Sequence, residues 1–292
     1  MTATTELPKT CLVLDSFALA YRAFFGMPST IRTRSGQAIN AVLGFYNTVY
    51  SLIEQFRPHY VVVASDHPEP TFRHNLYSEY KAQRPPMPED LKSQLPLIRE
   101  VIASLEIPLL KAPGYEADDI IGTITRCLPP KTHCYVITTD RDALQLSNEQ
   151  VTIVAPNSRA NKVYTPEIVK HEWGVVPERI PDVKALMGDG SDNIPGVPLV
   201  GPKTAVRWLQ VYDTVENLLE HVHELKGKAA QNLAAHKEEV LLYKYLATIN
   251  CSVPGIICWK QAMLGFDPQV VRQTLDQIGI RASVPSTDHL VS

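Results

Sequence analysis

Residues 11–15 of the chain are Cys-Leu-Val-Leu-Asp, a short apolar run that ends on a carboxylate. An apolar run without polar alternation is typical of a strand buried on both faces, as in a parallel sheet. Residues 60–66, Tyr-Val-Val-Val-Ala-Ser-Asp, repeat the arrangement, and residues 134–140, Cys-Tyr-Val-Ile-Thr-Thr-Asp, repeat it again. Residues 38–56, between the first two runs, carry apolar side chains at helical spacing. The sequence therefore predicts an α/β fold with a mostly parallel sheet flanked by helices.

Each of these runs ends on an aspartate: Asp15, Asp66 and Asp140. Because open α/β sheets bind ligands outside the carboxyl ends of their strands, we expect these side chains in one site. Asp142 follows Asp140 at the spacing that puts two side chains on one face of an extended chain. For Asp15 the alternative is that it only caps the next helix, which is common for aspartate.

Three more acids, Glu116, Asp118 and Asp119, crowd the start of an amphipathic segment. In the extended backbone before a first helical turn, Glu116 and Asp118 would face the same side and could reach one metal ion. The alternative is that the acids are present only because the positive end of the helix dipole favours them.

The segment Gly-Asp-Gly-Ser-Asp-Asn-Ile-Pro-Gly at 188–196 adds Asp189 and Asp192 in a turn-rich setting suited to a hard cation. A glycine-bounded hairpin follows, and Pro202 suits the first position of the next helix. Free N–H groups at such a helix start can hold a backbone phosphate without reading sequence. The residues expected to contact nucleic acid there are Gly196, Gly201, Lys203, Thr204 and Arg207.

Between residues 72 and 88, basic residues alternate with tyrosines and are followed by prolines. Cations for phosphates and rings for bases are the combination that grips single strands. A solvated charged loop is the alternative. The next segment, 91–105, has one apolar face and is predicted to be a single helix.

Composition sets further limits. The chain has 292 residues and a formal net charge of −3, but the nine acids named above carry −9, so the rest of the chain carries +6. The five cysteines form no CxxC pair, which disfavours a disulfide framework or a zinc site. The first ten residues lack the apolar core of a signal peptide. No apolar run approaches the roughly 20 residues of a membrane span. We therefore expect a cytoplasmic protein that is not associated with a membrane.

Carboxylates from five places in the chain repel one another unless cations lie among them. Mg²⁺ and Mn²⁺ prefer oxygen ligands, and two such ions about 4 Å apart can activate a water and stabilise the leaving oxygen of a phosphodiester. No His/Cys ligand set, Ser-His-Asp signature or Walker loop competes with this interpretation. The acids therefore predict phosphodiester chemistry on nucleic acid.

Six stretches, in order, give the chain a specific resemblance. They are LVLDSFALAYRAFF (12–25), SDHPEPTFRH (65–74), YKAQRP (80–85), GYEADDIIGT (114–123), ITTDRDALQL (137–146) and GDGSDNIPGVPLVGPKTA (188–205). The chain resembles the 5′ nuclease, or flap endonuclease, family, and most of all the 5′→3′ exonuclease domain of bacterial DNA polymerase I. The resemblance implies a PIN-like nuclease domain over 1–175 with an arch near 72–90. It also implies a helical DNA-binding domain with a helix–three-turn–helix module over 176–280, and we expect a loose tail over 281–292.

The resemblance also implies roles for single residues. Asp15, Asp66, Glu116 and Asp118 match one metal site; Asp140, Asp142, Asp189 and Asp192 match a second, with Asp119 the weakest match of the nine. Lys81 and Arg84 match basic arch residues that contact the scissile phosphate, and Tyr21, Arg22 and Arg73 match positions near the substrate strand. The implied cofactors are two Mg²⁺ or Mn²⁺ ions, with K⁺ at the hairpin module.

One residue departs from the family pattern: Leu199 stands in the hairpin where the family usually has glycine. A positive φ at that position would weaken the grip on duplex DNA. The expected protein is a monomeric 5′→3′ exonuclease and flap endonuclease acting on 5′ flaps, nicks, branched DNA ends and RNA–DNA primers, beside a separate DNA polymerase. The resemblance also implies a protein of bacterial type that is associated with the nucleoid. Two alternatives are a non-catalytic branched-DNA-binding module of the same fold and a ribonuclease on a related sheet.

Overall fold

A computed structural model of the chain describes residues 9–157, 159–256 and 259–286. Its centre is a sheet that, in this described part, has six strands in the order β3-β2-β1-β4-β5-β6. All neighbouring pairs are parallel except β5 and β6, so the predicted mostly parallel sheet is confirmed. The strands are β1 (Lys9–Asp15), β2 (Tyr60–Ala64), β3 (Leu109–Leu110), β4 (Thr132–Ile137), β5 (Val151–Ala155) and β6 (Lys162–Tyr164).

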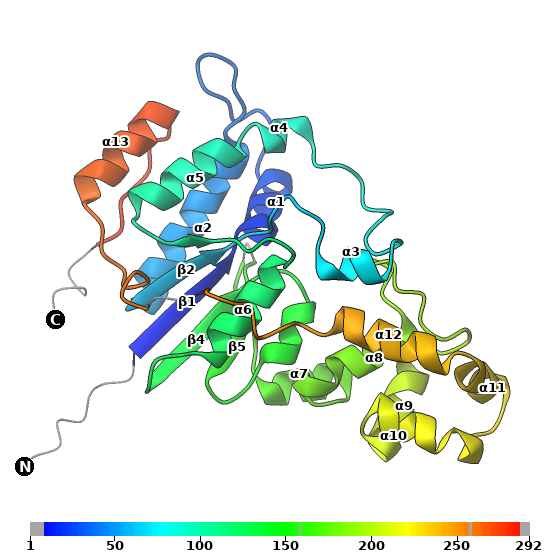
Figure 1. Ribbon diagram of the computed structural model, residues 1–292. Helices are drawn as coiled ribbons and strands as arrows, with labels where there is room; N and C mark the ends of the chain where they lie inside the picture. The colour runs from blue at the N-terminus through cyan, green and yellow to red at the C-terminus, as the bar shows by residue number, and fades with distance from the viewer. Residues whose placement is uncertain (1–8, 158, 257–258, 287–292) are drawn as a thin grey trace, which may run out of the picture.

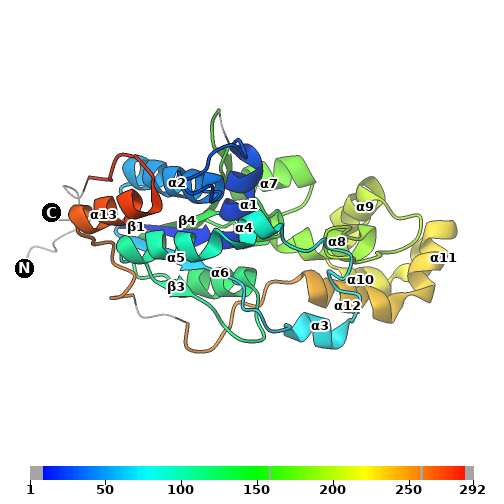
Figure 2. The same cartoon turned by 90° about the horizontal axis from the view of Figure 1, so that it is seen from above.

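The two faces of the sheet carry different layers, because successive side chains of a strand point to opposite sides. Leu12 and Leu14 of β1 belong to one apolar cluster, and Cys11 and Val13 belong to another. The first cluster joins the sheet to α1 (Ser16–Gly26), α2 (Asn40–Phe56), α5 (Leu95–Ser104) and α13 (Pro268–Ile278). The second joins it to α6 (Ala117–Arg126) and to the helices that follow residue 175. Figures 1 and 2 show these layers.

A group of helices projects from one end of the sheet (Figure 1). In this group α8 packs against both α9 and α12. Its members are α8 (Ile180–Met187), α9 (Pro202–Tyr212), α10 (Val215–Glu220), α11 (Lys228–Ala235) and α12 (Lys237–Ala247), and α7 (Pro166–Trp173) lies between the sheet and the group. The helical texture that the sequence predicts beyond about residue 175 is therefore present.

The last helix, α13, does not belong to this group. It packs against α5 on the first face of the sheet, through Val271 and Leu275 (Figures 1 and 2). The chain reaches it along the edge of the sheet, where Val61 donates its N–H to the carbonyl of Ala262 at 2.8 Å. The span 176–280 thus contains elements that lie in two separate places.

The segment 91–105 is two helices and not one, which corrects the sequence prediction. A short α4 (Glu89–Lys92) is followed by a break at Ser93 and Gln94 before α5 begins. Pro96 lies in the first turn of α5, where its missing N–H and fixed φ favour a helix start over a continuous helix.

The part of the predicted tail that the structure describes, 281–286, has no helix or strand but is held against α2. Tyr46 donates its hydroxyl to the carbonyl of Ser283 at 2.5 Å, and Ser286 donates its N–H to Glu54 at 2.8 Å. Residues 287–292 of that tail, residues 1–8 and Cys258 lie outside the described residues.

Candidate active site

The strand order places a site where the chain changes direction across the sheet. From β1 the chain runs outward to β2 and β3, then returns to β4 on the other side of β1. The crevice between the carboxyl ends of β1 and β4 is the position where such sheets bind ligands. Asp15 ends β1, and Asp140 follows β4 by three residues.

Asp15 has both of the roles that its sequence position allows. Its Oδ1 accepts a hydrogen bond from the N–H of Ala18 at 3.0 Å, so it caps α1. Its Oδ2 accepts from the hydroxyl of Thr138 at 2.8 Å, which fixes the carboxylate at the switch point. The cap does not exclude a functional role, because the carboxylate remains beside the other acids.

The start of α6 brings three more acids to the same place. Asp66, just past β2, accepts from the N–H of Ala117 at 2.7 Å. Glu116 is the extended N-cap of α6, whereas Asp118 lies inside its first turn. This corrects the expectation that both would be extended. Asp118 nevertheless lies near Glu116 and the strand-end acids, because burial and the charges of Asp140, Asp15 and Glu116 raise its pKa.

Loop 188–196 closes on itself and carries the remaining acids. Asp189 and Ile194 exchange backbone hydrogen bonds of 2.8 and 2.9 Å. Gly188 and Gly196 stand back to back at φ +82° and +69°, and a Cβ on Gly196 would lie 2.2 Å from the nitrogen of Gly188. Only glycine fits at this contact.

A lysine joins two acids of this region. Lys184 of α8 forms ion pairs with Asp142 and with Asp189, the latter at 2.5 Å. Burial raises the pKa of Asp189, but the charge of Lys184 and hydrogen bonds from Lys184 and Ser191 outweigh it and hold the pKa at about 2. Lys184 is 4% exposed, so both ion pairs are shielded from water.

The segment predicted as an arch lies directly on loop 188–196. Lys81 binds Glu116 at 2.8 Å, and Arg84 binds Asp192 at 2.8 Å. The hydroxyl of Tyr80, 2% exposed, lies within hydrogen-bond distance of both Glu116 and Asp192, at 3.0 and 2.9 Å, and shares its one proton between them. Tyr80 therefore ties the acid at the start of α6 to the acid of the loop.

Four of the acids have pKa values that their surroundings raise. Burial raises the pKa of Asp15 to about 6, with help from the charges of Asp66 and Asp140. Burial also raises the pKa of Asp66, of Asp140 and, most strongly, of Asp118. Several buried carboxylates facing one another are costly when ionised, and a multivalent cation among them would relieve that cost.

The donor set fits a hard divalent ion, because it consists of carboxylate oxygens from separate elements. Among the residues that the structure describes, no three Asp, Glu, His or Cys side chains are gathered closely enough to hold an ion as they stand. Lys81, Arg84 and Lys184 are seated on the acids instead. Metal binding would require these ammonium and guanidinium groups to move aside.

Two of the predicted site residues, Asp119 and Arg73, are buried and bind each other. Asp119 is 0% exposed and accepts two hydrogen bonds from Arg73, each 2.8 Å long. Arg73, 2% exposed, also donates to the carbonyls of Leu246 and Thr248. Arg73 also lies 3.3 Å from Glu116 of the acid set. The structure therefore gives Asp119 and Arg73 a role in packing beside the site, whereas the sequence predicts a metal ligand and a contact to the substrate strand.

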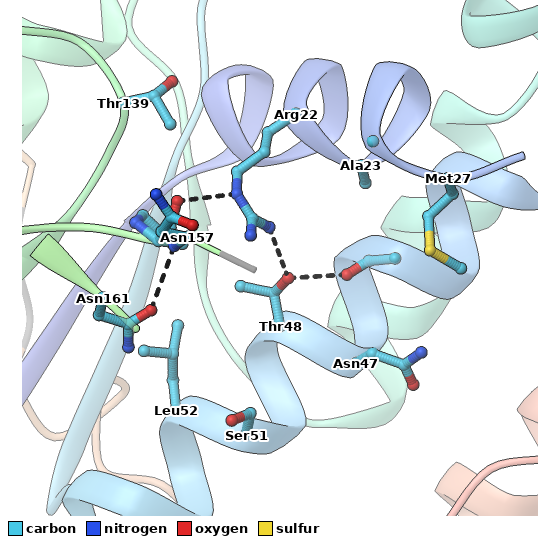
Figure 3. A pocket seen from close by; sticks show the side chains of 13 residues that line it. Arg22, Ala23, Met27, Asn47, Thr48, Ser51, Leu52, Thr139, Asn157 and Asn161 are labelled. Atoms are coloured by element: carbon cyan, nitrogen blue, oxygen red, sulfur yellow. Dashed lines mark hydrogen bonds between the residues drawn. The ribbon is translucent and has the colours of Figure 1, made fainter. Parts of the chain in front are cut away.

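Tyr21 and Arg22 lie on different surfaces. Tyr21 lines a cleft of about 700 Å³ together with Arg84, Asp140 and Asp189. Arg22 lines a neighbouring pocket, where its side chain donates to the carbonyl of Pro156 at 2.9 Å (Figure 3). Of the two, only Tyr21 lies in this cleft, which is lined by three of the acids, Asp140, Asp142 and Asp189.

The predicted hairpin and helix start are present. Gly201 is the N-cap of α9, Pro202 begins that helix, and the exposed Lys203 lies in its first turn. Thr204 and Arg207 follow in the same helix.

Leu199 of this hairpin has φ +67°, the conformation in which a side chain is strained. Its side chain is also 67% exposed, so little packing offsets the strain. We expect Leu199→Gly to raise the free energy of unfolding by about 1 kcal/mol, measured by urea denaturation. An unchanged or lower free energy of unfolding would contradict this account.

Sequence reasoning missed Tyr80, Lys184 and Thr138 as members of the site. Lys184 lies in a helix whose other residues, apart from Asp182, are apolar, and a lysine on a buried face is the available signal. Tyr80 belonged to a run whose rings were assigned to bases. Thr138 precedes Asp140 by two residues, but a strand-end threonine gives no signal of its own.

A parallel sheet with acids at its switch point, joined to a helical unit with a glycine hairpin, defines a nuclease of the α/β class. Residues 10–174 match the N-terminal resolvase-like domain of 5′-3′ exonucleases, and residues 175–267 match their C-terminal SAM fold. The chain belongs to the 5′-3′ exonuclease family.

The relatives differ in length. A 5′-3′ exonuclease of Aquifex aeolicus is 42% identical over 81% of this chain and 80% of its own length. DNA polymerase I of Bacillus caldotenax is 41% identical over 85% of this chain, which spans only 29% of that polymerase.

Solved structures agree on the fold. The 5′-exonuclease of bacteriophage T5 with bound zinc ions has a TM-score of 0.68 at 22% identity, covering 92% of this chain and 98% of that one. A T5 flap endonuclease in a complex with DNA and metal ions has a TM-score of 0.67 at 21% identity with the same coverage. At these identities the likeness establishes the fold. Separately, none of the helices described here is long and apolar enough to cross a membrane.

Proposed function

We propose that the chain is a divalent-metal-dependent 5′→3′ exonuclease and structure-specific flap endonuclease. Its substrates are 5′ flaps, nicks and branched DNA ends, together with RNA–DNA primer ends. The observation that carries the proposal is the set of eight acids around the β1–β4 switch point, with Lys81 and Arg84 seated on them. The names of its relatives, exonuclease and flap endonuclease, support the same activity.

Eight residues would hold two Mg²⁺ or Mn²⁺ ions: Asp15, Asp66, Glu116, Asp118, Asp140, Asp142, Asp189 and Asp192. Ions bound by such carboxylates supply water activation and charge stabilisation at a phosphodiester. Tyr80 orients Glu116 and Asp192, and Lys184 offsets the charges of Asp142 and Asp189 while no ion is bound.

Lys81 and Arg84 have a further role. When metal ions neutralise Glu116 and Asp192, these two side chains lose their present partners and become available to a phosphate. Arg84 is half exposed, so it can turn toward a strand entering the cleft. Both would stabilise negative charge that develops on the scissile phosphate.

The hairpin would hold the duplex beside the cut. Gly196, Gly201, Lys203, Thr204 and Arg207 provide backbone N–H groups and cations for a sequence-independent phosphate contact. A K⁺ ion held by hairpin carbonyls would complete this grip. The proposed assembly is a monomer that works beside a DNA polymerase, either separate or joined to it in a longer chain.

The deciding experiment uses a 5′-flap DNA labelled at its flap end. Cleavage near the junction is expected with Mg²⁺ and absent with EDTA. A non-catalytic binding module is the second candidate, because cations already occupy the acids. Retained binding of the flap DNA in a gel shift, with no cleavage in Mg²⁺ or Mn²⁺, would establish that candidate and exclude the nuclease.

Stabilisation by Mg²⁺ should depend on pH with a definite sign. Burial raises the pKa of Asp15 to about 6, so without metal this carboxyl is protonated at about pH 5 and ionised at about pH 7.5. Its contribution to stability without metal is lost as pH rises from about 4 through about 6, because the folded state then buries a charge.

Since Mg²⁺ must displace the proton below pH 6, we expect a larger Mg²⁺-induced rise in Tm at about pH 7.5 than at about pH 5. Differential scanning calorimetry at both values measures it, and the exposed Asp276→Asn is the matched control. Equal rises at the two pH values would contradict the assignment of Asp15 as a metal ligand.

A further inference from the structure

The segment between α3 (Phe72–Leu76) and α4 crosses from the helical group to the sheet layer (Figures 1 and 2). At one end Arg73 of α3 donates to the carbonyl of Leu246 in α12, and at the other end α4 packs against α1. Residues 78–83 of this segment form turns. The position of Lys81 and Arg84 over the acids therefore depends on what these turns bind.

Loop 188–196 binds the segment through main-chain atoms. Three successive loop carbonyls accept hydrogen bonds from the arch; the pairs are Gly190 with Gln83 Nε2 (2.6 Å), Ser191 with Arg84 Nε (3.1 Å) and Asp192 with the Lys81 N–H (3.1 Å). In the opposite direction, Nδ2 of Asn193 donates to the carbonyl of Glu79 at 2.7 Å. These four hydrogen bonds are called the arch–loop contact below.

The arch–loop contact differs from the ion pairs beside it in its acceptors. Lys81 and Arg84 pair with the carboxylates of Glu116 and Asp192, which are the groups that a divalent ion would occupy. Every acceptor in the arch–loop contact is a main-chain carbonyl. Metal binding at the carboxylates would therefore displace the ends of the two cationic side chains and leave the arch–loop contact closed.

The backbone on both sides of the contact has an unusual conformation. Asn193 has φ +58°, which asparagine adopts more readily than most residues. Lys81 has φ +55°, which is unfavourable for lysine and persists only where the surrounding structure imposes it. Because Asp189 and Ile194 close the loop with two backbone hydrogen bonds, the loop provides a fixed support for the strained turn.

The contact joins the two parts of the chain that match separate family models. Residues 79–84 belong to the part that spans 10–174, whereas the loop belongs to the part that spans 175–267. A displacement of about 1 Å at a reacting centre can cost about 100-fold in rate. The arch–loop contact thus determines how precisely Lys81 and Arg84 stand relative to the acids of the loop.

We propose that Gln83 and Asn193 are positioning residues, which hold Lys81 and Arg84 over the acids whether or not a metal ion is bound. They act on the scissile phosphate only through those two cations. The inference rests on the proposed nuclease function for its effect on rate, but the contact itself is tested without cleavage.

Amide hydrogen exchange, measured by mass spectrometry on peptides that cover residues 79–84, tests the contact in the full chain. The unaltered protein should exchange at the same slow rate, within about twofold, in EDTA and in Mg²⁺. Asn193→Gly permits the same backbone conformation but removes the donor, so it should speed exchange about tenfold in both conditions. If Mg²⁺ speeds exchange of the unaltered protein as much, or if Asn193→Gly leaves exchange unchanged, the proposal is wrong.

The effect on rate is tested with Gln83→Ala and a matched control, Gln210→Ala. Both are exposed glutamines whose Nε2 donates to a glycine carbonyl, Gly190 at 2.6 Å and Gly174 at 3.2 Å. In single-turnover cleavage of 5′-flap DNA with Mg²⁺, Gln83→Ala should be about tenfold slower at saturating protein, with half-saturation unchanged. Gln210→Ala should cleave as the unaltered protein does.

A comparison in a second background separates positioning from a general folding defect. In Lys81→Ala/Arg84→Ala no cation remains to be positioned, so adding Gln83→Ala should slow cleavage by less than about twofold. A further tenfold loss in that background, or no loss in Gln83→Ala alone, would overturn the proposal. If the unaltered protein does not cleave in Mg²⁺ while exchange behaves as expected, the nuclease function is excluded and the arch–loop contact stands.

Discussion

Asp140→Asn is expected to slow cleavage of a 5′-flap DNA on the order of 1,000-fold. The carboxylate follows β4 at the switch point, and it acts electrostatically on Asp15, Asp118 and Lys184. Asparagine has nearly the same shape but supplies a neutral oxygen, which a hard divalent ion binds much less well. The change therefore removes charge from the centre of the acid set without creating a cavity.

The same substitution should leave the metal-free protein at least as stable. Burial raises the pKa of Asp140, so its ionised form is unfavourable in the fold, and the charge of Lys184 offsets only part of this. A substitution that lowers activity without lowering stability is expected where carboxylates are gathered for function at a cost in stability. Single-turnover cleavage and urea denaturation measure the two quantities.

Asp276→Asn, at an exposed position of α13, is the control for loss of one carboxylate. It should change neither rate nor stability by more than a small factor. If Asp140→Asn cleaves within tenfold of the unaltered protein, the acid set is not the catalytic centre. If it unfolds more easily, Asp140 is instead a structural partner of Lys184.

The sequence predicts the strand-end acids because topology alone brings them together. Asp15, Asp66 and Asp140 each follow an apolar run, and a parallel sheet places such positions at one edge. Asp189 and Asp192 come from a loop whose closed conformation requires glycine at positions 188 and 196. In these cases local pattern and global arrangement agree, so no knowledge of packing is required.

Which of the other side chains enter the site depends on packing between elements, and packing could not be predicted from the sequence pattern. Asp118 and Asp119 are adjacent in α6, yet one faces the acids and the other faces Arg73. The helix rotates successive side chains by about 100°, so the exact start of α6 decides which of them enters the site. Whether Lys184 enters the site similarly depends on which face of α8 packs against η1 (Asp142–Leu146).

Arg73→Met is expected to lower the free energy of unfolding by about 4 kcal/mol. Arg73, in α3 (Phe72–Leu76), binds Asp119 of α6 through two hydrogen bonds and the carbonyls of Leu246 and Thr248 through two more. It thus joins the sheet layer to the end of α12. Methionine fills similar volume but leaves the carboxylate of Asp119 buried without its counter-ion, and that uncompensated charge is the main cause of the loss.

Two further variants separate this explanation from a role in substrate binding. Arg73→Lys keeps the charge but lacks the planar fork, so it should lose clearly less stability than Arg73→Met. Arg73→Met combined with Asp119→Leu removes both charges and should recover part of the loss, as measured by urea denaturation. If Arg73→Met instead stays within 1 kcal/mol of the unaltered protein and raises the KM for flap DNA, Arg73 contacts the strand. The guanidinium of Arg73 uses four of its five donors inside the protein, and its Nη1 also lies 3.3 Å from Glu116. Because the group is buried and paired on all sides, we expect stability, and not KM, to register the change.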